Sequence, residues 1–286
     1  MTSVCAILAA VLVGTWNGNW FPSGRAEHRA HTDVEEATVS AAAKMLAGAL
    51  KAADPEGTND VILCFNEIRG PRVASNLVAR IGRAGLKVAS VSGYRRRDRF
   101  DYQQDVIATT LPVADATWSA WRVAGKETPP RGYAFAAVVL EPATTANVYA
   151  VHLKSNYGAT TKEIARLNAA KREGAVRQLV ALEKPPRSKK AKARPVIVAG
   201  DFNADRWSRE FAGEETFSLL EDAGFFNALS LLPADRRGTH PSKKYGDSAL
   251  DYVFCRGLEA ASAPTIVPNE NLSDHWAVFA PFRPKE

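Results

Sequence analysis

Carboxylate, amide and imidazole side chains stand at the ends of short apolar runs throughout this 286-residue sequence. Residues 61–65, for example, are apolar and are followed directly by Asn66 and Glu67. The end of a strand holds a side chain rigidly at the rim of a sheet, where a catalytic group is well placed. The side chains in such positions are Asn17, Glu67, His152, Asp201, Asn203, Asp251, Asp274 and His275. The pattern therefore predicts one site at the rim of a sheet.

These residue types fit the metal-assisted hydrolysis of a phosphodiester. Hard cations such as Mg²⁺ prefer carboxylate and amide oxygens, which Glu67, Asn17 and Asp274 supply. A phosphodiester anion repels a hydroxide nucleophile, so the site must neutralise charge and orient the attacking water. A histidine beside a carboxylate can accept a proton near neutral pH, which makes His275 the candidate general base and Asp251 its candidate partner.

Each motif taken alone also has an ordinary structural explanation. Gly200–Asn203 fits a turn in which Asp and Asn bond their own backbone, and Ser273–His275 fits a helix cap or loop. Glu67 fits the first exposed position of a loop, and His152 fits a satisfied core histidine. Their joint occurrence at successive strand boundaries favours a functional site. The sequence contains no Gly-rich phosphate loop and no His-x-x-x-His pair of the kind that binds catalytic zinc.

Short apolar runs alternate with longer helix-like stretches, which predicts a mixed α and β domain. The predicted strands are residues 11–16, 61–66, 87–92, 105–110, 134–140, 147–153, 195–200, 250–255 and 276–280. The predicted helices are residues 33–52, 71–84, 161–183 and 214–223. An approximate helical stripe in the third helix consists of Ile164, Leu167, Ala175, Leu179 and Leu182. No internal repeat or interdomain linker interrupts the pattern, so we expect one catalytic domain over residues 11–283.

The composition is that of a globular protein, with 46% hydrophobic and 24% charged residues and a net charge of +6. That charge favours a nucleic-acid substrate only slightly. The three cysteines are too few and too scattered for a disulfide framework, and we expect Cys64 and Cys255 to be small buried hydrophobes. Residues 1–10 are interpreted as a leader or disordered stub, because the apolar start lacks the positive charge of a secretory signal. Localisation stays open.

The ordered set of strand-end motifs resembles the endonuclease/exonuclease/phosphatase superfamily. This is the DNase I-like group that contains exonuclease III-type nucleases, neutral sphingomyelinases and inositol-polyphosphate 5-phosphatases. The resemblance runs from about residue 11 to residue 280. It implies an α+β fold, namely a four-layer αββα sandwich of two packed, mostly antiparallel sheets flanked by helices. It also implies a site at one end of the two sheets.

The resemblance implies a role for each acid and amide. Glu67 is expected to be the main metal carboxylate, helped by Asn17 and Asp274. Asp201 and Asn203 are expected to position the nucleophile and to hold the phosphate or a second metal. The usual cofactor of the superfamily is Mg²⁺, and Mn²⁺ is often accepted.

The same resemblance implies roles for the histidines. His152 is expected to bind the scissile phosphate, and His275, oriented by Asp251, to act as general base. The implied reaction is in-line displacement by water without a covalent intermediate. Two residues depart from the usual pattern, because Asn66 stands where many members have Gln and Trp276 stands where a small residue or proline is common. Histidine at position 152 points away from the exonuclease III branch, which typically has Tyr there.

Basic and polar residues near these motifs are candidate substrate contacts. Arg95 and Arg96 belong to a stretch with four arginines in six positions, and arginine forks bind phosphate well. Asn156 and Lys243 are the other two predicted contacts. The accompanying candidates for stacking or for a cationic rim are Tyr94, Phe100, Tyr102, Thr239, His240, Lys244, Arg25, His28, Arg29 and His31. A solvated basic loop is the alternative for each of them, as it is for residues 183–195.

The basic rims favour a nuclease of low sequence specificity that acts on DNA first, or on RNA, because phosphate contacts position a nucleic acid without reading its bases. The alternative is a phosphatase or phosphodiesterase of lipid head groups or inositol phosphates, with an apolar pocket around Trp20, Phe21, Trp118 and Trp121. A non-catalytic binding module is disfavoured, since all the catalytic-type residues are present. We expect a monomer with no stable membrane insertion.

Overall fold

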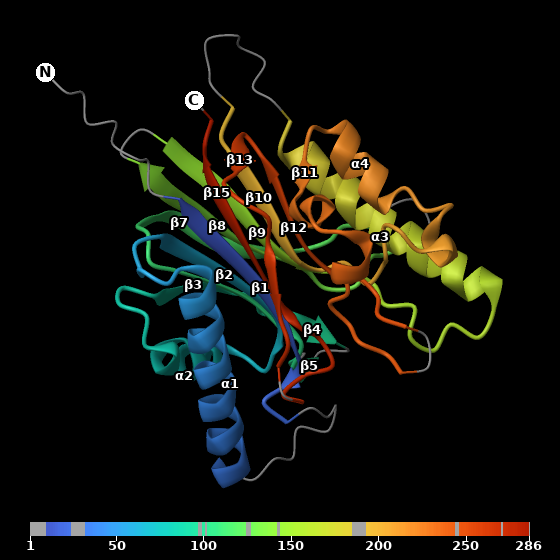
Figure 1. Ribbon diagram of the computed structural model, residues 1–286. Coiled ribbons are helices and arrows are strands. Elements are labelled where there is room, and N and C mark those ends of the chain that lie inside the picture. The colour runs from blue at the N-terminus through green and yellow to red at the C-terminus, as the bar shows by residue number, and fades with distance from the viewer. Residues whose placement is uncertain are drawn as a thin grey trace, which may run out of the picture.

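The computed structural model describes residues 10–23, 32–96, 99–100, 102–123, 127–141, 144–184, 193–243, 246–269 and 271–285. Two sheets pack face to face in the middle of the molecule (Figure 1). The first has the order β13-β15-β1-β2-β6-β3, with β14 also paired to β15. Its strands are β1 (Val11–Phe21), β2 (Asp60–Ile68), β3 (Lys87–Val91), β6 (Gln104–Thr109), β13 (Leu258–Ala260), β14 (Thr265–Val267) and β15 (Ala277–Pro284).

The second sheet has the order β11-β12-β10-β9-β8-β7. Its strands are β7 (Val113–Ala120), β8 (Gly132–Glu141), β9 (Thr144–His152), β10 (Val196–Asp201), β11 (Phe226–Asn227) and β12 (Asp251–Arg256). Each sheet contains one parallel pair, β1 with β2 and β9 with β10, and its other pairings are antiparallel. A separate two-stranded hairpin is formed by β4 (Arg95–Arg96) and β5 (Arg99–Phe100).

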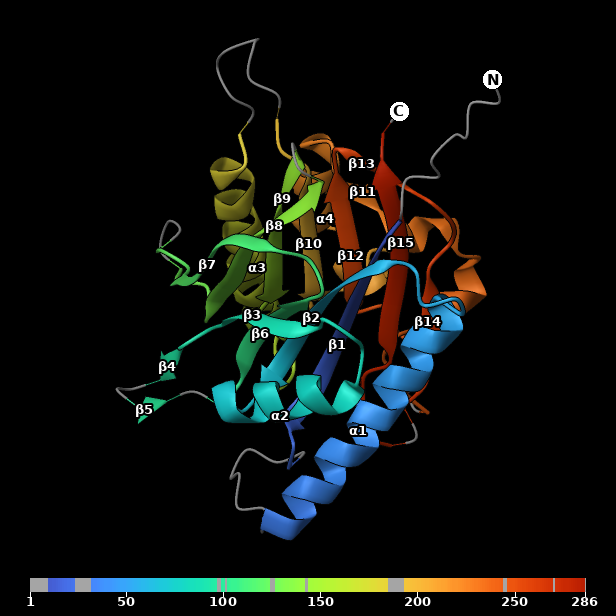
Figure 2. The ribbon, with the colours of Figure 1, turned by 90° about the vertical axis from the view of Figure 1, so that its left-hand side faces the viewer.

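Helices cover the outer faces of both sheets. Helices α1 (Thr32–Ala53) and α2 (Pro71–Ile81) pack on the first sheet, and α3 (Lys162–Leu182) and α4 (Thr216–Asp222) lie beyond the second, as Figure 2 shows from the side. Short 3₁₀ turns lie at Arg209–Phe211, Ala228–Leu231 and Ala234–Arg236. The architecture confirms the predicted four-layer α+β sandwich. None of the helices in the described part of the chain is both long and apolar enough to cross a bilayer.

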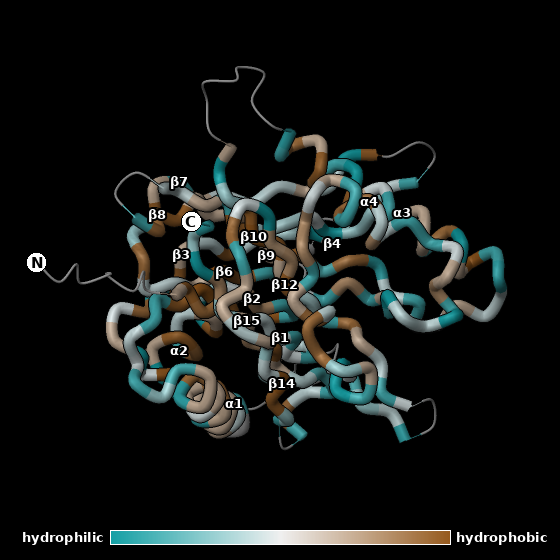
Figure 3. Tube along the Cα trace, turned by 45° about the horizontal axis from the view of Figure 1, so that its top comes forward, coloured by the Kyte–Doolittle hydropathy of each residue, from teal (hydrophilic) through white to brown (hydrophobic). Residues whose placement is uncertain are grey.

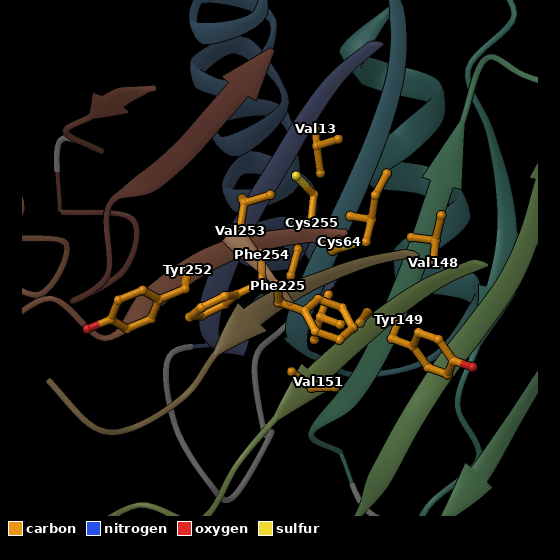
Figure 4. Close-up of a cluster of buried hydrophobic side chains, with 14 of the residues drawn as sticks. Val13, Cys64, Val148, Tyr149, Val151, Phe225, Tyr252, Val253, Phe254 and Cys255 are labelled. Atoms are coloured by element: carbon orange, nitrogen blue, oxygen red, sulfur yellow. The ribbon is translucent and has the colours of Figure 1, made fainter. Parts of the chain in front are cut away.

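Apolar side chains fill the spaces between the layers. One buried cluster lies between the sheets and continues under α3 and α4, and a second lies between the first sheet and the helices α1 and α2. Hydrophobic stretches accordingly follow the packed strands, and hydrophilic ones gather in the outer loops (Figure 3). Cys64 and Cys255 lie beside Val13 in the inter-sheet cluster (Figure 4), which confirms that both are buried hydrophobes. Cys5 lies outside the described residues.

The predicted helices and most of the predicted strands are present in the structure, and the differences discussed next concern the third helix and strand β7. The stripe noted in the third helix is only partly buried, because Ala175 and Leu179 are buried and the other three members, Ile164, Leu167 and Leu182, are exposed. The buried face of the helix contains Asn168 and Arg172, since the first half of α3 packs on a polar loop. Strand β7 was not predicted, although apolar and polar residues alternate from Ala114 to Ala120; it is an exposed edge strand, and most of its apolar residues are alanines.

Candidate active site

The register of three adjacent strands places three of the predicted side chains in one row. Asp201, the last residue of β10, pairs with His152 on the parallel strand β9 and with Asp251 on the antiparallel strand β12. Paired residues on neighbouring strands project to the same face about 5 Å apart. Strand β10 is apolar up to its last residue, Asp201. The Asp201 carboxylate therefore lies between a histidine and a second carboxylate.

The facing sheet contributes Asn17 and Glu67. Asn17 pairs with Asn66 in the parallel β1–β2 register, and this register shifts immediately afterwards. Glu67 lies in an irregularity of the β2–β6 pairing, with a left-handed φ of 58° that non-glycine residues seldom adopt. The backbone N–H of Trp20 donates to Glu67 Oε2 at 2.9 Å and holds the redirected carboxylate. Strain of this kind is common at functional sites.

The two sheets meet at His152. Its Nε2 lies 3.6 Å from Glu67 Oε1 and 3.5 Å from Asp201 Oδ2. The Asn17 side-chain amide donates to Asp201 Oδ2 at 2.9 Å and lies 3.5 Å from Glu67 Oε1. All four side chains are buried. The predicted metal carboxylate, nucleophile-positioning carboxylate and phosphate-binding histidine are thus brought together.

Burial shifts the proton affinities of this centre. It raises the pKa of Asp201 to about 7, with His275 acting against the rise and Asp251 adding to it. Burial, together with the positive charges of Arg131, His275 and Lys154, lowers the pKa of His152 well below its ordinary value. His152 is therefore a neutral imidazole at physiological pH.

A second histidine pairs with a carboxylate at the edge of the centre. His275 Nδ1 lies 2.8 Å from Asp251 Oδ2, and Thr239 Oγ1 donates to the same oxygen at 2.8 Å. His275 Nε2 is left facing Asp201 Oδ2 at 3.8 Å. Burial alone would lower the pKa of His275, but the charges of Asp251, Asp201 and Asp274 raise it to about 10. The geometry is that of a base whose ring is oriented by its partner.

Asp274 lies on the outer side of His275. One carboxylate oxygen is 4.0 Å from His275 Nε2, and the other is 3.7 Å from His240 Nε2. Burial tends to raise the pKa of Asp274, but the hydrogen bond from His240 and the charges of His275 and His240 hold it below its usual value. Asp274 thus contacts the two histidines and accepts a hydrogen bond from Ser273 Oγ at 3.4 Å, and its role as a metal ligand beside Glu67 stays a prediction.

The donor set of the centre suits a divalent cation. Glu67 and Asp201 bring two buried carboxylates toward one imidazole, and a cation between them would offset the cost of burying like charges. Asn17 directs its amide nitrogen at these carboxylates, and its Oδ1 accepts the N–H of Asn19 at 2.9 Å, so its role as a metal ligand stays a prediction. His152 Nδ1 and Asp251 Oδ1 are buried atoms without a hydrogen-bond partner in the described structure.

Asn203 lies within the centre, whereas Asn156 lies beside it. Asn203 adopts a left-handed φ of 52° and donates through Nδ2 to Asp201 Oδ2 at 3.0 Å. The Asn156 side chain accepts a hydrogen bond from Arg172 at 3.2 Å and lies 3.5 Å from Glu210. In this structure it therefore holds the loop after β9 to its neighbours. Its role as a substrate contact stays a prediction.

Only some of the basic candidates fall within the described residues. The β4–β5 hairpin that carries Arg95 and Arg96 lies toward the end of the sandwich where β1 ends (Figure 1). Arg95 and Lys243 are exposed. Lys244, Arg25, His28, Arg29 and His31 lie outside the described residues, as do residues 185–192 of the predicted basic loop. The side chains of Arg96 and Phe100 likewise lie outside the described part.

Two aromatic predictions were wrong. Tyr94 is buried, donates its hydroxyl to Asp105 Oδ2 at 2.9 Å and packs edge-on against Trp118, so it is closed to a nucleobase. The four aromatics proposed to line one apolar pocket do not form one, because Phe21 and Trp121 belong to different core clusters. Tyr102 is partly exposed, as the stacking prediction requires.

Several supporting contacts were not predicted, although Asn66 itself was noted in the sequence. Asn66 spans the two sheets: its Nδ2 donates to Asp105 Oδ1 at 2.7 Å and to the Val151 carbonyl at 3.0 Å, and its Oδ1 accepts the Asp201 N–H at 2.9 Å. Burial raises the pKa of Asp105 to about 7, against the bonds from Asn66 and Tyr94. Arg131 donates to the carbonyls of His152 and Leu153. The position of Asp105 at the start of the apolar run 106–108 was the one available signal.

The chain resembles solved structures of one fold. A family model described as the endonuclease/exonuclease/phosphatase family matches residues 14–275. An endonuclease/exonuclease/phosphatase family protein from Leptotrichia buccalis is 14% identical at a TM-score of 0.61, over 96% of this chain and 100% of that one. TDP2 from D. rerio, complexed with a single-strand DNA product, is 12% identical at a TM-score of 0.59, over 96% and 99% of the two chains.

A sphingomyelinase C from Streptomyces griseocarneus is 18% identical at a TM-score of 0.59, over 95% of this chain and 99% of that one. At these identities the similarity shows the fold alone. No curated protein matches the sequence. The family model, however, spans most of the chain, and the motifs from β1 to the start of β15 lie within or beside it. This chain therefore belongs to the endonuclease/exonuclease/phosphatase family, whose members are phosphoester hydrolases that generally depend on a divalent metal.

Proposed function

We propose that this protein is a metal-dependent phosphodiesterase that cleaves nucleic acid, DNA in the first place, with little sequence specificity. The observation that carries the proposal is the convergence of Glu67, Asp201 and the Asp251–His275 pair from both sheets. The exposed arginine of the β4–β5 hairpin supports a polyanionic substrate. The fold is shared with a TDP2 that was solved with a single-strand DNA product.

The proposed roles follow from the contacts of each side chain. Glu67 and Asp201 would hold a Mg²⁺ ion, with Asn17 and Asn203 fixing the orientation of Asp201 through their amides. The ion would supply charge that neutralises the phosphate and assists ionisation of water. The carboxylates around His275 raise its pKa to about 10, and the positive charge of a cation held by Glu67 and Asp201 would act against that rise. His275 would then accept the proton of the attacking water at Nε2, with Asp251 stabilising the imidazolium through Nδ1. Neutral His152 donates a hydrogen bond to the phosphate from Nε2.

The alternative is that the same catalytic core hydrolyses a phosphodiester of a lipid head group. The similar fold of a sphingomyelinase C supports that alternative. Two observations lead us to favour nucleic acid. Phe21 and Trp121, two of the aromatics expected around one apolar pocket, belong to separate core clusters, and Arg95 of the β4–β5 hairpin is exposed. The substrate class is therefore the first quantity to measure.

Purified protein should be offered plasmid DNA, RNA, sphingomyelin and inositol phosphates with Mg²⁺, with and without EDTA. We expect metal-dependent nicking of DNA, and a loss of turnover on the order of a hundredfold or more in His275→Ala. Asp201→Asn should be inactive as well, and Asp115→Asn, the same change on the exposed strand β7, should keep full activity. Turnover of lipid or inositol substrates alone would overturn the nuclease proposal, and unchanged turnover in folded His275→Ala would remove the proposed base.

A further inference from the structure

A second group of metal-ligating atoms lies next to the proposed centre. His240, Asp274 and His275 each present one ligand atom, and these atoms all lie within 4.8 Å of one another. The two imidazole rings are edge to face, with centroids 4.9 Å apart. The ligand types of the two groups differ. Among the described residues, this group has two imidazole nitrogens, whereas the group around Glu67 and Asp201 has mostly carboxylate oxygens.

The backbone holds both imidazoles in place. The N–H of His240 donates to the Ser248 carbonyl at 2.9 Å, and the Ser248 N–H returns a bond to His240 at 3.0 Å. The N–H of Trp276, next to His275, donates to the Thr239 carbonyl at 2.6 Å and joins the two segments. The Asp251 carboxylate occupies His275 Nδ1, which leaves Nε2 as the ligand atom. A carboxylate behind a metal-binding histidine in this way fixes the ring and raises its basicity.

The ligand types match a borderline cation better than a hard one. Two imidazole nitrogens and one carboxylate oxygen suit Zn²⁺, with water in the fourth position, whereas Mg²⁺ prefers oxygen. In a tetrahedral site with bonds of about 2.0–2.1 Å, ligand atoms stand roughly 3.3 Å apart. The two imidazole nitrogens lie 3.7 and 4.0 Å from different oxygens of Asp274, and with one ligand atom from each residue all separations are within 4.8 Å, so the three side chains must move inward to close on an ion. The side chains of Asp274 and His240 are 52% and 30% exposed, which gives an ion access and leaves room for that movement.

We propose that His240, Asp274 and His275 form an inhibitory site for Zn²⁺ or a similar imidazole-preferring divalent cation. The bound ion takes the Nε2 lone pair of His275, the same lone pair that must accept a proton from water, so occupied protein lacks its general base. Binding releases any protons held on the two imidazoles to solvent. The inhibitory effect rests on the proposed function, whereas the binding site itself does not.

Binding can be measured without any substrate. Metal-stripped protein in excess Mg²⁺ is titrated with Co²⁺, whose visible absorption reports a tetrahedral nitrogen and oxygen site, and then with Zn²⁺ to displace it. We expect His240→Ala to weaken Zn²⁺ binding by at least about tenfold, which is about 1.4 kcal/mol. Lys243→Ala, on the same loop, should bind as the wild type does. The double variant His28→Ala/His31→Ala, which removes two histidines that stand close together in the sequence, should also keep the site.

Inhibition is measured on any substrate that the protein turns over, each variant being normalised to its own activity in Mg²⁺. The Zn²⁺ concentration for half-inhibition should rise by at least about tenfold in His240→Ala. Unaltered Zn²⁺ affinity in His240→Ala, or its loss in the His28→Ala/His31→Ala variant, would overturn the site. Zn²⁺ that binds at His240 and leaves turnover unaffected would overturn the inhibitory role. Tight Zn²⁺ binding by a protein that hydrolyses no phosphodiester would instead count against the proposed function.

Discussion

At the scale of single residues, the structure assigns different proton affinities to similar side chains. His152 and His275 are both buried, yet burial and nearby positive charge lower the pKa of the first, whereas the surrounding carboxylates raise the pKa of the second to about 10. The difference arises from the partner, because Asp251 lies 2.8 Å from His275 whereas His152 Nδ1 has no partner in the described structure. Two histidines of one centre are thereby suited to different tasks.

Replacing Asp251 by Asn should shift the pH dependence of the reaction. The negative charge of Asp251 raises the pKa of His275, so its removal lowers that pKa and His275 loses its proton at a lower pH. The acidic limb of kcat/KM, which requires neutral His275, should move to lower pH, while turnover falls by roughly a hundred- to ten-thousandfold through lost orientation. Asp247→Asn, an exposed neighbour in the same region, is the control and should leave the profile unchanged. An acidic limb that moves to higher pH in Asp251→Asn would contradict the assignment.

At the scale of elements, two of the proposed site residues lie where the backbone is irregular. Glu67 and Asn203 both have left-handed φ values, and both directly follow a buried run. Gly200 permits β10 to approach β9, since a Cβ atom there would lie 1.9 Å from the Val151 carbonyl oxygen. The loop after β9 is held by Arg172 of α3, which is only 1% exposed and pairs with Glu214 through two bonds of 2.7 and 2.6 Å.

Breaking the Arg172–Glu214 pair should destabilise the protein more than removing it entirely. Arg172→Met leaves the buried Glu214 carboxylate without its counter-charge, and we expect a loss of about 3–5 kcal/mol in the free energy of unfolding. The double variant Arg172→Met/Glu214→Leu buries no unpaired charge and should recover much of that loss. Urea denaturation measures both. A double variant as unstable as the single one would show that lost packing, and not the unpaired charge, sets the cost.

At the scale of the whole molecule, the sandwich brings together residues from both ends of the chain. Strand β1 pairs with β15, so Asn17 and His275 share one edge although they lie 258 positions apart. Asn66 then connects this sheet to the second through the Val151 carbonyl and the Asp201 N–H. The net charge of +6 acts on the same scale, because it attracts a polyanion without specifying its sequence.

Cleavage of DNA should weaken steeply as salt is added. With about three phosphates neutralised, affinity should fall roughly fortyfold between about 50 and 200 mM salt. Arg95→Ala should lower the slope of log affinity against log salt by about one, if its side chain contacts phosphate as predicted. Lys51→Ala, in the last turn of α1, is the matched loss of one charge away from the proposed rim and should leave the slope unchanged. Binding that does not respond to salt would contradict a polyanionic substrate.

The sequence by itself determined the residue types of the site and the elements that present them. Apolar runs that end in Glu67, Asp201 or His152 predict strands with polar ends, because strand periodicity and burial are local properties of the chain. The ordered motifs also indicated the αββα sandwich, which the structure confirms. The expectation of one domain over 11–283 and the assigned catalytic roles stay predictions.

Only the tertiary structure decided which of these side chains touch. The redirection of Glu67 depends on a bulge, the placement of Asn66 depends on the distance between two sheets, and the burial of Tyr94 depends on Asp105 beneath it. The proximity of His240 to His275 likewise arises from a bond between Thr239 and Trp276, the residue before β15. Contacts of this kind are set by close packing between segments that are remote in sequence, and local periodicity carries no information about them.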